Sequence, residues 1–338
     1  MSVLITSPSR LHLSLIDMNG ELGRVDGGIG VALNEPSLAI EASLVNKETE
    51  EKENPDEVVS ILRRIRNRIE PGLSGYYSIK ILKKLPSHAG LGSRTQLSLC
   101  IAKAISVLEN RNYNAVELAR LVGRGGTSGI GTAAFDNGGF ILDGGHVFRK
   151  SKDEKGIENE ELIKTSFLPS SASRVLPPPV IFQHPLPEDW FFVLAIPMVQ
   201  RGAHGTDEIE IFKQHCPIKR EEVGKICRIL LMRLLPSLHE KDIATFAESL
   251  TMLQWIGFKK IEVELQHDII KKGLFNFFAT HALGYGMSSF GPATYAIVEG
   301  QETAKVLAVA TKEFLDEKGI RALVCYSNAN NTGCEVKY

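Results

Sequence analysis

One stretch of the chain decides the fold prediction. It reads Pro86-Ser87-His88-Ala89-Gly90-Leu91-Gly92-Ser93. An alternating segment at 76–82 predicts a strand before it, and an apolar segment at 95–108 predicts a helix after it. Glycines let a backbone pass close to a ligand with its N–H groups turned inward, and the start of the helix adds partial positive charge. We therefore predict a phosphate-binding loop, in preference to a plain glycine turn that caps a helix.

Side chains that follow the loop extend the predicted site. Ser93 and Thr95 offer hydroxyls to phosphate oxygens or to a bound magnesium ion, and Arg94 offers a charge-assisted contact. Gln96 stands beside them. We predict that these residues, with Gly90, Leu91, Gly92 and Ser93 of the loop, bind phosphate.

Composition excludes several classes of protein. The 338 residues carry a net charge of −1, which predicts neither a nucleic-acid nor a membrane partner. The basic segment 63–68 is interpreted as the solvated face of a helix. No apolar run approaches the ~20 residues of a membrane span, and 1–5 lacks the basic start of a signal peptide. The five cysteines have no CxxC spacing, so we expect a reducing cytoplasm and no zinc site.

The length suits two domains. Proline clusters at 177–179 and 185–187 mark the expected boundary, which gives domains at 1–176 and 188–338. Helical and antiparallel-looking strand patterns mix throughout, so the predicted fold class is α+β.

Local signals predict several elements around the loop. Residues 10–15 alternate in the manner of a half-buried strand. Asn54 and Pro55 predict a helix start with Asn54 as the cap, and Asn114 with Glu117 predicts a capping box. Segments 140–142 and 147–149 are expected to be strands joined by a tight hairpin at 143–146.

The loop resembles the second signature of the GHMP-kinase superfamily, Pro-x-x-x-Gly-Leu-Gly-Ser-Ser-Ala. Residues 9–33 stand where the superfamily has its first motif, and the glycine-rich segment 284–292 stands where it has its third. The resemblance covers nearly the whole chain. It implies a two-lobed fold whose N-terminal lobe resembles domain 2 of ribosomal protein S5 and whose C-terminal lobe is ferredoxin-like.

The pattern departs from that of a kinase. Many superfamily kinases carry a catalytic aspartate in a Ser-Gly-x-Asp stretch, but here Gly131 stands at that position and cannot act as a base. One branch, the β-ribofuranosylaminobenzene 5′-phosphate synthase family, is more similar in several dissimilar strings. These are Ser9-Arg10-Leu11-His12-Leu13, 17–24, Gly90-Leu91-Gly92-Ser93 with Thr95-Gln96, 123–131, 134–140, Asp143-Gly144-Gly145-His146 and Arg201-Gly202-Ala203-His204-Gly205.

This resemblance implies an enzyme that condenses 5-phosphoribosyl 1-diphosphate with 4-aminobenzoate, or with a close relative such as 4-hydroxybenzoate. Carbon dioxide and diphosphate would be released, in tetrahydromethanopterin biosynthesis. The small molecules would be the partners, Mg²⁺ the expected cofactor with no ATP, and a homodimer the expected assembly.

That reaction suggests roles for five residues of the first motif. Asp17 or Asp26 would stabilise an oxocarbenium-like sugar, and Arg10 or Arg24 would grip the carboxylate of the aromatic acid. His12 is a candidate for proton transfer or phosphate contact, with a structural histidine as the alternative.

Other candidates lie further along the chain. Arg201 is another residue that could grip the carboxylate, and His204 another candidate for proton transfer or phosphate contact. The remaining candidates are Gly125 and Gly126 as an anion nest for the 5′-phosphate or as packing glycines, Ser288 and Ser289 as phosphate neighbours, and Ser93, Asp136 or Asp143 as metal ligands, with turn formation as the alternative for Asp143.

Two further functions stay open from the sequence. An ATP-dependent small-molecule kinase of the same superfamily is one, and a non-catalytic phosphosugar-binding protein is the other. The missing aspartate at Gly131 argues against the first, and the dense polar set at 10–26 argues against the second.

Overall fold

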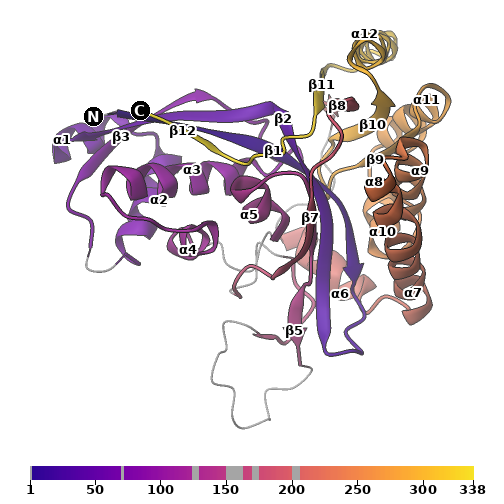
Figure 1. Cartoon of the computed structure of the whole chain (residues 1–338), viewed down its shortest axis with the longest axis horizontal. Coiled ribbons are helices and arrows are strands. Elements are labelled where there is room, and N and C mark those ends of the chain that lie inside the picture. Colours follow the sequence, from indigo (N-terminus) through magenta and orange to yellow (C-terminus); the bar gives the residue numbers. More distant parts are fainter. Residues whose placement is uncertain (1, 70–71, 124–128, 150–162, 170–174, 200–205) are drawn as a thin grey trace.

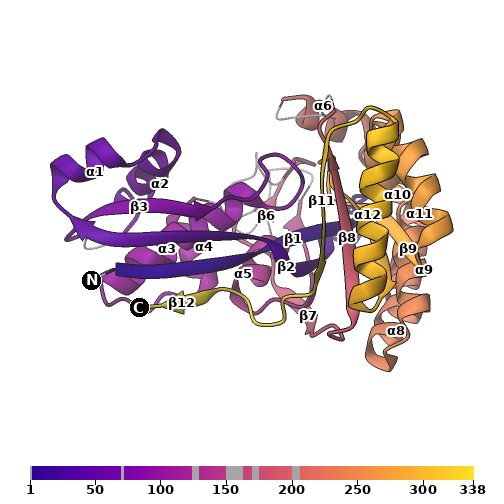
Figure 2. The ribbon, with the colours of Figure 1, turned by 90° about the horizontal axis from the view of Figure 1, so that it is seen from above.

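The computed structural model describes residues 2–69, 72–123, 129–149, 163–169, 175–199 and 206–338. Within them the chain forms two lobes that lie side by side (Figures 1 and 2). The class is α+β, as predicted.

The first lobe is built on an eight-stranded sheet. Its main path runs β12-β1-β2-β4-β7; β3 and β5 also pair with β2, and β6 pairs with β5. The strands are β1 (Ser2–Asp17), β2 (Arg24–Val45), β3 (Tyr76–Lys83), β4 (Phe140–Asp143), β5 (His146–Phe148), β6 (Ile163–Lys164), β7 (Val180–His184) and β12 (Glu335–Lys337). Residues 37–44 lie in the second half of β2, which pairs with β1 along most of its length.

Helices cover one face of this sheet (Figure 1). They are α1 (Lys47–Glu53), α2 (Asp56–Arg66), α3 (Ser93–Leu108), α4 (Ala115–Leu121) and α5 (Gly129–Asp136). The apolar side chains of α2 and α3 pack with those of β1, β2 and β3 in one buried cluster. The predicted capping box of α4 is present, with Asn114 accepting from the backbone of Glu117 and Glu117 accepting in return.

The second lobe is ferredoxin-like, as the superfamily resemblance implied. Its four strands have the order β11-β8-β10-β9, and all neighbours are antiparallel. The strands are β8 (Trp190–Pro197), β9 (Gly284–Met287), β10 (Thr294–Glu299) and β11 (Ala322–Asn328). The helical segments are α6 (Thr206–His215), α7 (Arg220–Ile229), the π-helical η4 (Leu230–Leu234), α8 (Leu235–Glu240), α9 (Ile243–Leu253), α10 (Gly257–Glu264), the π-helical η5 (Ile269–Leu274), α11 (Phe275–His281) and α12 (Gln301–Glu317).

Two predictions of local structure were wrong. Pro55, and not Asn54, is the cap of α2, because the Asn54 side chain is buried and bonds to the backbone of Tyr77 and Ile79 on β3. The segments around 143–146 do not form a hairpin, because β4 and β5 both pair with β2 and not with each other. Gly145, with φ +62°, lets the chain pass within contact of the Val25 carbonyl on β2.

One buried core joins the two lobes. It combines apolar residues of β1 and β2 with those on one face of β8 and with α7, α8 and α9. Phe246 of α9 contacts the ring of Phe140 on β4, with centroids 6.1 Å apart, and that of Trp190 on β8, 4.9 Å away. The division at 176 and 188 stays a prediction, although the connection itself carries β7 and the C-terminal end returns to β1 as β12.

Replacing Phe246 by alanine removes a ring that both lobes share. We expect Phe246→Ala to lower the free energy of unfolding by about 3–5 kcal/mol, measured by denaturant titration. Val306→Ala, at a position 67% exposed on α12, is the control and should change it by less than about 0.5 kcal/mol. A loss below about 1 kcal/mol for Phe246→Ala would contradict the shared core.

Candidate active site

The phosphate loop is held by contacts from two distant segments. Arg10 on β1 donates from Nη1 to the carbonyl of Gly90, and Ser288 Oγ donates to the same carbonyl at 2.6 Å. The φ of Gly90 is +86°, and a Cβ there would lie 2.2 Å from the Ser288 carbonyl oxygen. This position therefore requires glycine. The three segments that resemble the superfamily motifs meet here.

The segment 284–292 is also bound to β1. The His12 backbone N–H donates to Ser288 Oγ at 2.9 Å, and the Ser289 N–H donates to the His12 carbonyl at 3.1 Å. Ser288 is buried and uses its hydroxyl in these contacts, whereas Ser289 lines a cavity. Of this predicted pair, only Ser289 therefore faces the space where a ligand can lie.

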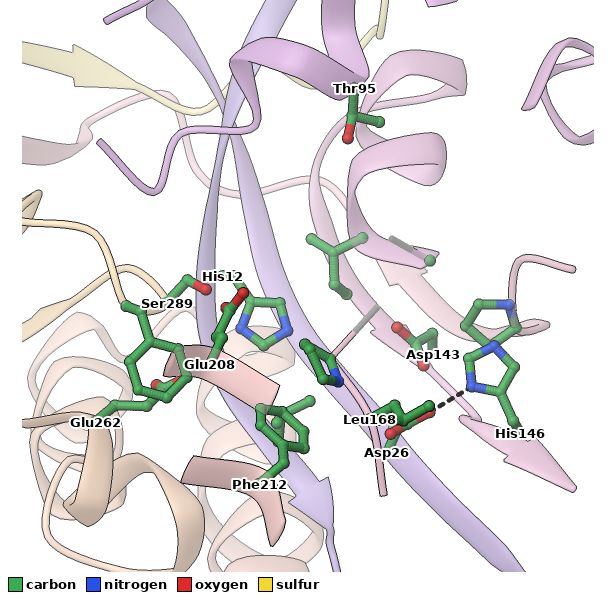
Figure 3. A pocket seen from close by; sticks show the side chains of 18 of the residues that line it. His12, Asp26, Thr95, Asp143, His146, Leu168, Glu208, Phe212, Glu262 and Ser289 are labelled. Carbon is green, nitrogen blue, oxygen red and sulfur yellow. Dashed lines mark hydrogen bonds and ion pairs between the residues drawn. The ribbon is translucent and has the colours of Figure 1, made fainter. Parts of the chain in front are cut away.

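The cavity has a volume of about 200 Å³ and lies between the two lobes (Figure 3). The first lobe contributes β1, β2, β4, β5 and the starts of α3 and α5, and the second contributes α6, α10 and the segment 284–292. Its charged and polar lining consists of Arg10, His12, Asp26, Thr95, Asp143, His146, Glu208, Glu262 and Ser289.

Arg10 and His12 project from β1 at the phosphate-loop side of the cavity. Burial lowers the pKa of Arg10 to about 10, against the opposing effect of the Glu262 charge. Burial and the charges of Arg10 and Lys259 hold the pKa of His12 well below its ordinary value, so its imidazole is neutral. Arg10 Nε and His12 Nδ1 are buried and have no hydrogen-bond partner among the described residues, which is uncommon for buried polar atoms.

The predicted phosphate ligands in the first turn of α3 differ in burial and in their contacts. Thr95 lines the cavity, Ser93 is half-buried and Arg94 is exposed. Gln96 is fully buried, accepts from Ser7 Oγ at 2.6 Å and donates to the Gly131 carbonyl at 2.9 Å. Its amide therefore joins α3 to β1 and α5.

Asp26 belongs to a buried ionic network at the other side of the cavity. Lys164 Nζ donates to both Asp26 carboxylate oxygens, at 3.1 and 2.9 Å. His146 Nδ1 lies 2.5 Å from Asp26 Oδ2, and its Nε2 donates to the Leu176 carbonyl at 3.0 Å. Although burial opposes it, the hydrogen bond from His146 and the charge of Lys164 lower the pKa of Asp26. Asp26 is thus a carboxylate with fixed geometry.

Asp143 faces the cavity beside this network. Its Oδ1 accepts from the Gly145 N–H at 3.0 Å. A Cβ at Gly28 would lie 3.2 Å from His12 Nε2 and 3.3 Å from Asp143 Oδ2, so the two side chains approach the same glycine. Burial and the neighbouring Asp26 charge raise the pKa of Asp143 to about 7. This carboxyl therefore changes its charge near neutral pH.

Several predicted residues lie outside the cavity lining. Asp17 accepts from the N–H groups of Asn19 and Gly20, at 2.7 and 3.1 Å, in the turn after β1. Arg24 is exposed and donates to the carbonyls of residues 144 and 145 at 2.8 and 2.7 Å. Asp136 is exposed at the end of α5. The predictions for Gly125, Gly126, Arg201 and His204 fall outside the described residues.

The sequence analysis missed four charged residues near the cavity. Lys164 lies beyond a charged segment, and nothing in its sequence context indicates a buried partner. Glu208 and Glu262 lie on helices where carboxylates are ordinary surface residues. Only Lys259 and Glu262 carried a signal in the sequence, because opposite charges three residues apart on a helix are close enough to pair. In the structure both side chains are almost fully buried and form an ion pair.

Removal of the Asp143 charge tests the electrostatics of the cavity. The folded-state pKa, about 7, lies above the ordinary 3.8, so ionisation of Asp143 destabilises the fold as pH rises from about 4 to 7. Relative to wild type, Asp143→Asn should gain stability over this interval and remain level above it. Denaturant unfolding measured at pH 4 to 8 gives the difference, and a difference that is flat with pH would contradict the assigned pKa.

Comparison with known proteins places this arrangement in a family. Residues 56–144 match the GHMP kinases N terminal domain, which includes the phosphate loop and α3. A homoserine kinase from Cytophaga hutchinsonii has a similar structure, with a TM-score of 0.63 at 18% identity, over 99% of this chain and 97% of that one. This likeness concerns the fold alone.

Two relatives are much more similar in sequence. A β-ribofuranosylphenol 5′-phosphate synthase of Methanocaldococcus jannaschii is 42% identical over 99% of this chain and 100% of its own length. One from Methanothermobacter thermautotrophicus is 41% identical over 88% and 89%. The chain is therefore an enzyme that belongs to the β-ribofuranosylphenol 5′-phosphate synthase family.

Proposed function

We propose that the enzyme joins C1 of 5-phosphoribosyl 1-diphosphate to the ring carbon of a para-substituted benzoate that bears the carboxylate. Diphosphate and carbon dioxide leave. The relatives are named for a ribofuranosylphenol product, and this favours 4-hydroxybenzoate as the acceptor over 4-aminobenzoate. The pathway would be tetrahydromethanopterin biosynthesis.

The observation that carries this proposal is the cavity at the start of α3, with Arg10 and Thr95 on one side and buried carboxylates on the others. The loop carbonyl of Gly90 is engaged by Arg10 and Ser288. This arrangement supports an anion at the start of α3, where the helix dipole and unpaired N–H groups stabilise negative charge. A leaving diphosphate develops that charge, so its stabilisation lowers the barrier.

Mg²⁺ fits the proposed site as an ion held mainly by the phosphates of 5-phosphoribosyl 1-diphosphate. Within the described residues, no group of three or more His, Cys, Asp or Glu side chains is placed to hold a metal. Mg²⁺ in phosphate-transfer sites needs only one or two protein oxygens, because phosphates and water complete its shell. The hydroxyls of Ser93 and Thr95 at the start of α3 would supply them. The ion would neutralise charge on the departing diphosphate. Asp136, exposed at the far end of α5, is not supported in this role.

The ribose cation that remains needs an anion and a dry environment. Asp26 is the better supported of the two predicted aspartates, because it lines the cavity as an ordered carboxylate, whereas Asp17 caps a turn. Among the described arginines that were predicted to grip the acceptor carboxylate, Arg10 is supported by its place in the cavity and its unpartnered Nε. No covalent enzyme intermediate is needed, because positioning and electrostatics can carry such a displacement.

The kinase alternative would need a group that activates a hydroxyl acceptor where superfamily kinases carry aspartate. Gly131 has no side chain there, and its carbonyl bonds to Gln96. The absence of ATP as a substrate stays a prediction, as do the homodimer and the cytoplasmic location. The structure contains, among its described residues, no helix with the length and apolarity needed to cross a membrane.

An assay with purified protein, magnesium, the phosphoribosyl donor and 4-hydroxybenzoate tests the proposal directly. We expect diphosphate and carbon dioxide in equal amounts, and the same with 4-aminobenzoate if the amino compound is accepted. Absence of both products with both acceptors would refute the proposed function.

Donor binding distinguishes the synthase from the kinase. A ligand that binds the native state at 100 times its Kd stabilises it by about 2.7 kcal/mol. We expect 5-phosphoribosyl 1-diphosphate with magnesium to raise the Tm, and ATP with magnesium at the same concentration to raise it much less. A larger shift with ATP, accompanied by phosphorylation of a hydroxyl compound, would favour the kinase.

A further inference from the structure

Helix α6 and the segment 284–292 give the cavity an aromatic wall beside two carboxylates. Glu208 and Phe212 are four residues apart on α6, so they share a face, and both line the cavity. Phe290 lines it too, and Phe258 packs between the two rings, with centroids 4.4 Å from Phe212 and 5.9 Å from Phe290. An apolar surface with a carboxylate at its edge fits a planar aromatic ring that carries one polar substituent.

The two carboxylates of this wall are in different electrostatic situations. Glu262 forms a buried ion pair with Lys259 on the same helix, α10. Glu208 makes no ion pair or side-chain hydrogen bond with any described residue, although Glu262 and Phe212 share the cavity with it. Burial and the Glu262 charge raise the pKa of Glu208 to about 7 from its ordinary 4.5.

The charged and titratable groups that face Glu208 come from two packed elements. They are Glu262 on α10, whose charge acts on Glu208, and Arg10 and His12 on β1, which line the same cavity; Lys259 lies beside Glu262 on α10. Lys259 is paired with Glu262, His12 is neutral, and Arg10 donates to the Gly90 carbonyl, so none of the three forms an ion pair with Glu208. A carboxylate that gains and loses a proton near neutral pH, and that pairs with no other described residue, is suited to proton transfer with a ligand.

A phenolic acceptor needs a base at its para substituent more than an amino acceptor does. Ring carbon attack on C1 of the ribose draws electrons from the para substituent. A phenol oxygen becomes a strong donor only when its proton leaves, whereas a neutral amino group already donates its nitrogen lone pair. A base at the para position therefore accelerates the phenolic reaction much more than the amino reaction.

We propose that Glu208 is the base for the para hydroxyl of a phenolic acceptor and sets the preference between phenolic and amino acceptors. This inference rests on the proposed function. The O–H bond breaks and its proton passes to Glu208 as the ring carbon bonds to C1 and the C1–diphosphate bond breaks. Carbon dioxide then leaves, its bonding electrons restore the aromatic ring, and Glu208 returns the proton to the phenol oxygen.

The arrangement of the cavity supports this orientation. Figure 3 shows Glu208, Glu262 and Ser289 gathered on one side and Asp26, Asp143 and His146 on the other. A ring against Phe212 and Phe290 with its hydroxyl at Glu208 directs the opposite carbon toward the Asp26 side. That side is where the positively charged ribose would be stabilised, so the two reacting carbons face each other.

Glu208→Gln tests the inference, because glutamine keeps the size of the side chain and cannot take the proton. We expect kcat/KM to fall about 100-fold with 4-hydroxybenzoate, within the usual range for a lost general base, and less than about tenfold with 4-aminobenzoate. With the phenolic acceptor, wild-type kcat/KM should rise through pH 7, the pKa of Glu208, and the variant should lose this rise. Asp143 titrates in the same range but acts on both acceptors, so the amino acceptor controls for it.

Two further variants keep the test decisive. Glu210→Gln changes an exposed glutamate of the same helix, paired with Lys213, and should leave both reactions unchanged. Glu208→Asp keeps an ionisable carboxylate and should preserve the phenolic reaction better than Glu208→Gln, which decides the matter if the glutamine variant does not fold.

Several outcomes would overturn the inference. Equal losses with the two acceptors, an unaltered pH rise in Glu208→Gln, or no advantage of Glu208→Asp would each show that Glu208 is not the base, while the proposed function would stand. If the wild-type enzyme uses only 4-hydroxybenzoate, the inference is tested by whether Glu208→Gln loses the rise of kcat/KM with pH. Wild-type protein that is inactive with both acceptors would instead refute the proposed function itself.

Discussion

The carbonyl of Gly90 is the point on which the site depends. It accepts hydrogen bonds from Arg10 on β1 and from Ser288 before β10, two residues far apart in the chain. These bonds occupy the carbonyl of the loop at a glycine whose positive φ no bulkier residue adopts at low cost. The same contacts join the two lobes at the loop, beside the cavity.

The shared core stabilises this contact between the two lobes. Apolar side chains of β1 and β2 belong to the same buried cluster as those of β8 and α9. Close-packed interiors resist displacement because each shift forfeits many contacts. A cavity between two lobes joined in this way keeps its dimensions, and preorganised groups can stabilise charge without reorganising during the reaction.

The charges of the cavity are divided between fixed and adjustable groups. Asp26 is held ionised by Lys164 and His146, and Glu262 forms an ion pair with Lys259. Asp143 and Glu208 lack such compensation, and burial raises the pKa of each to about 7. The proposed reaction would use both kinds: permanent charge to stabilise a cationic sugar, and carboxyls that exchange protons near neutral pH.

The sequence by itself determined the α+β class, the glycine loop between a strand and helix α3, and the capping box of α4, because each rests on local periodicity, local capping or a motif of adjacent residues. The ferredoxin-like second lobe followed from the resemblance to the superfamily. It also placed Arg10, His12, Asp26 and Thr95 among the site residues. Only the tertiary structure decided that Gln96 is a buried link from α3 to β1 and α5. It alone decided that the chain at Asp143–His146 continues along β2 instead of turning back, and that Glu208 and Glu262 line the same cavity. Those outcomes depend on which distant segments pack together, and burial by distant segments is what converts an ordinary surface carboxylate into a group with a raised pKa.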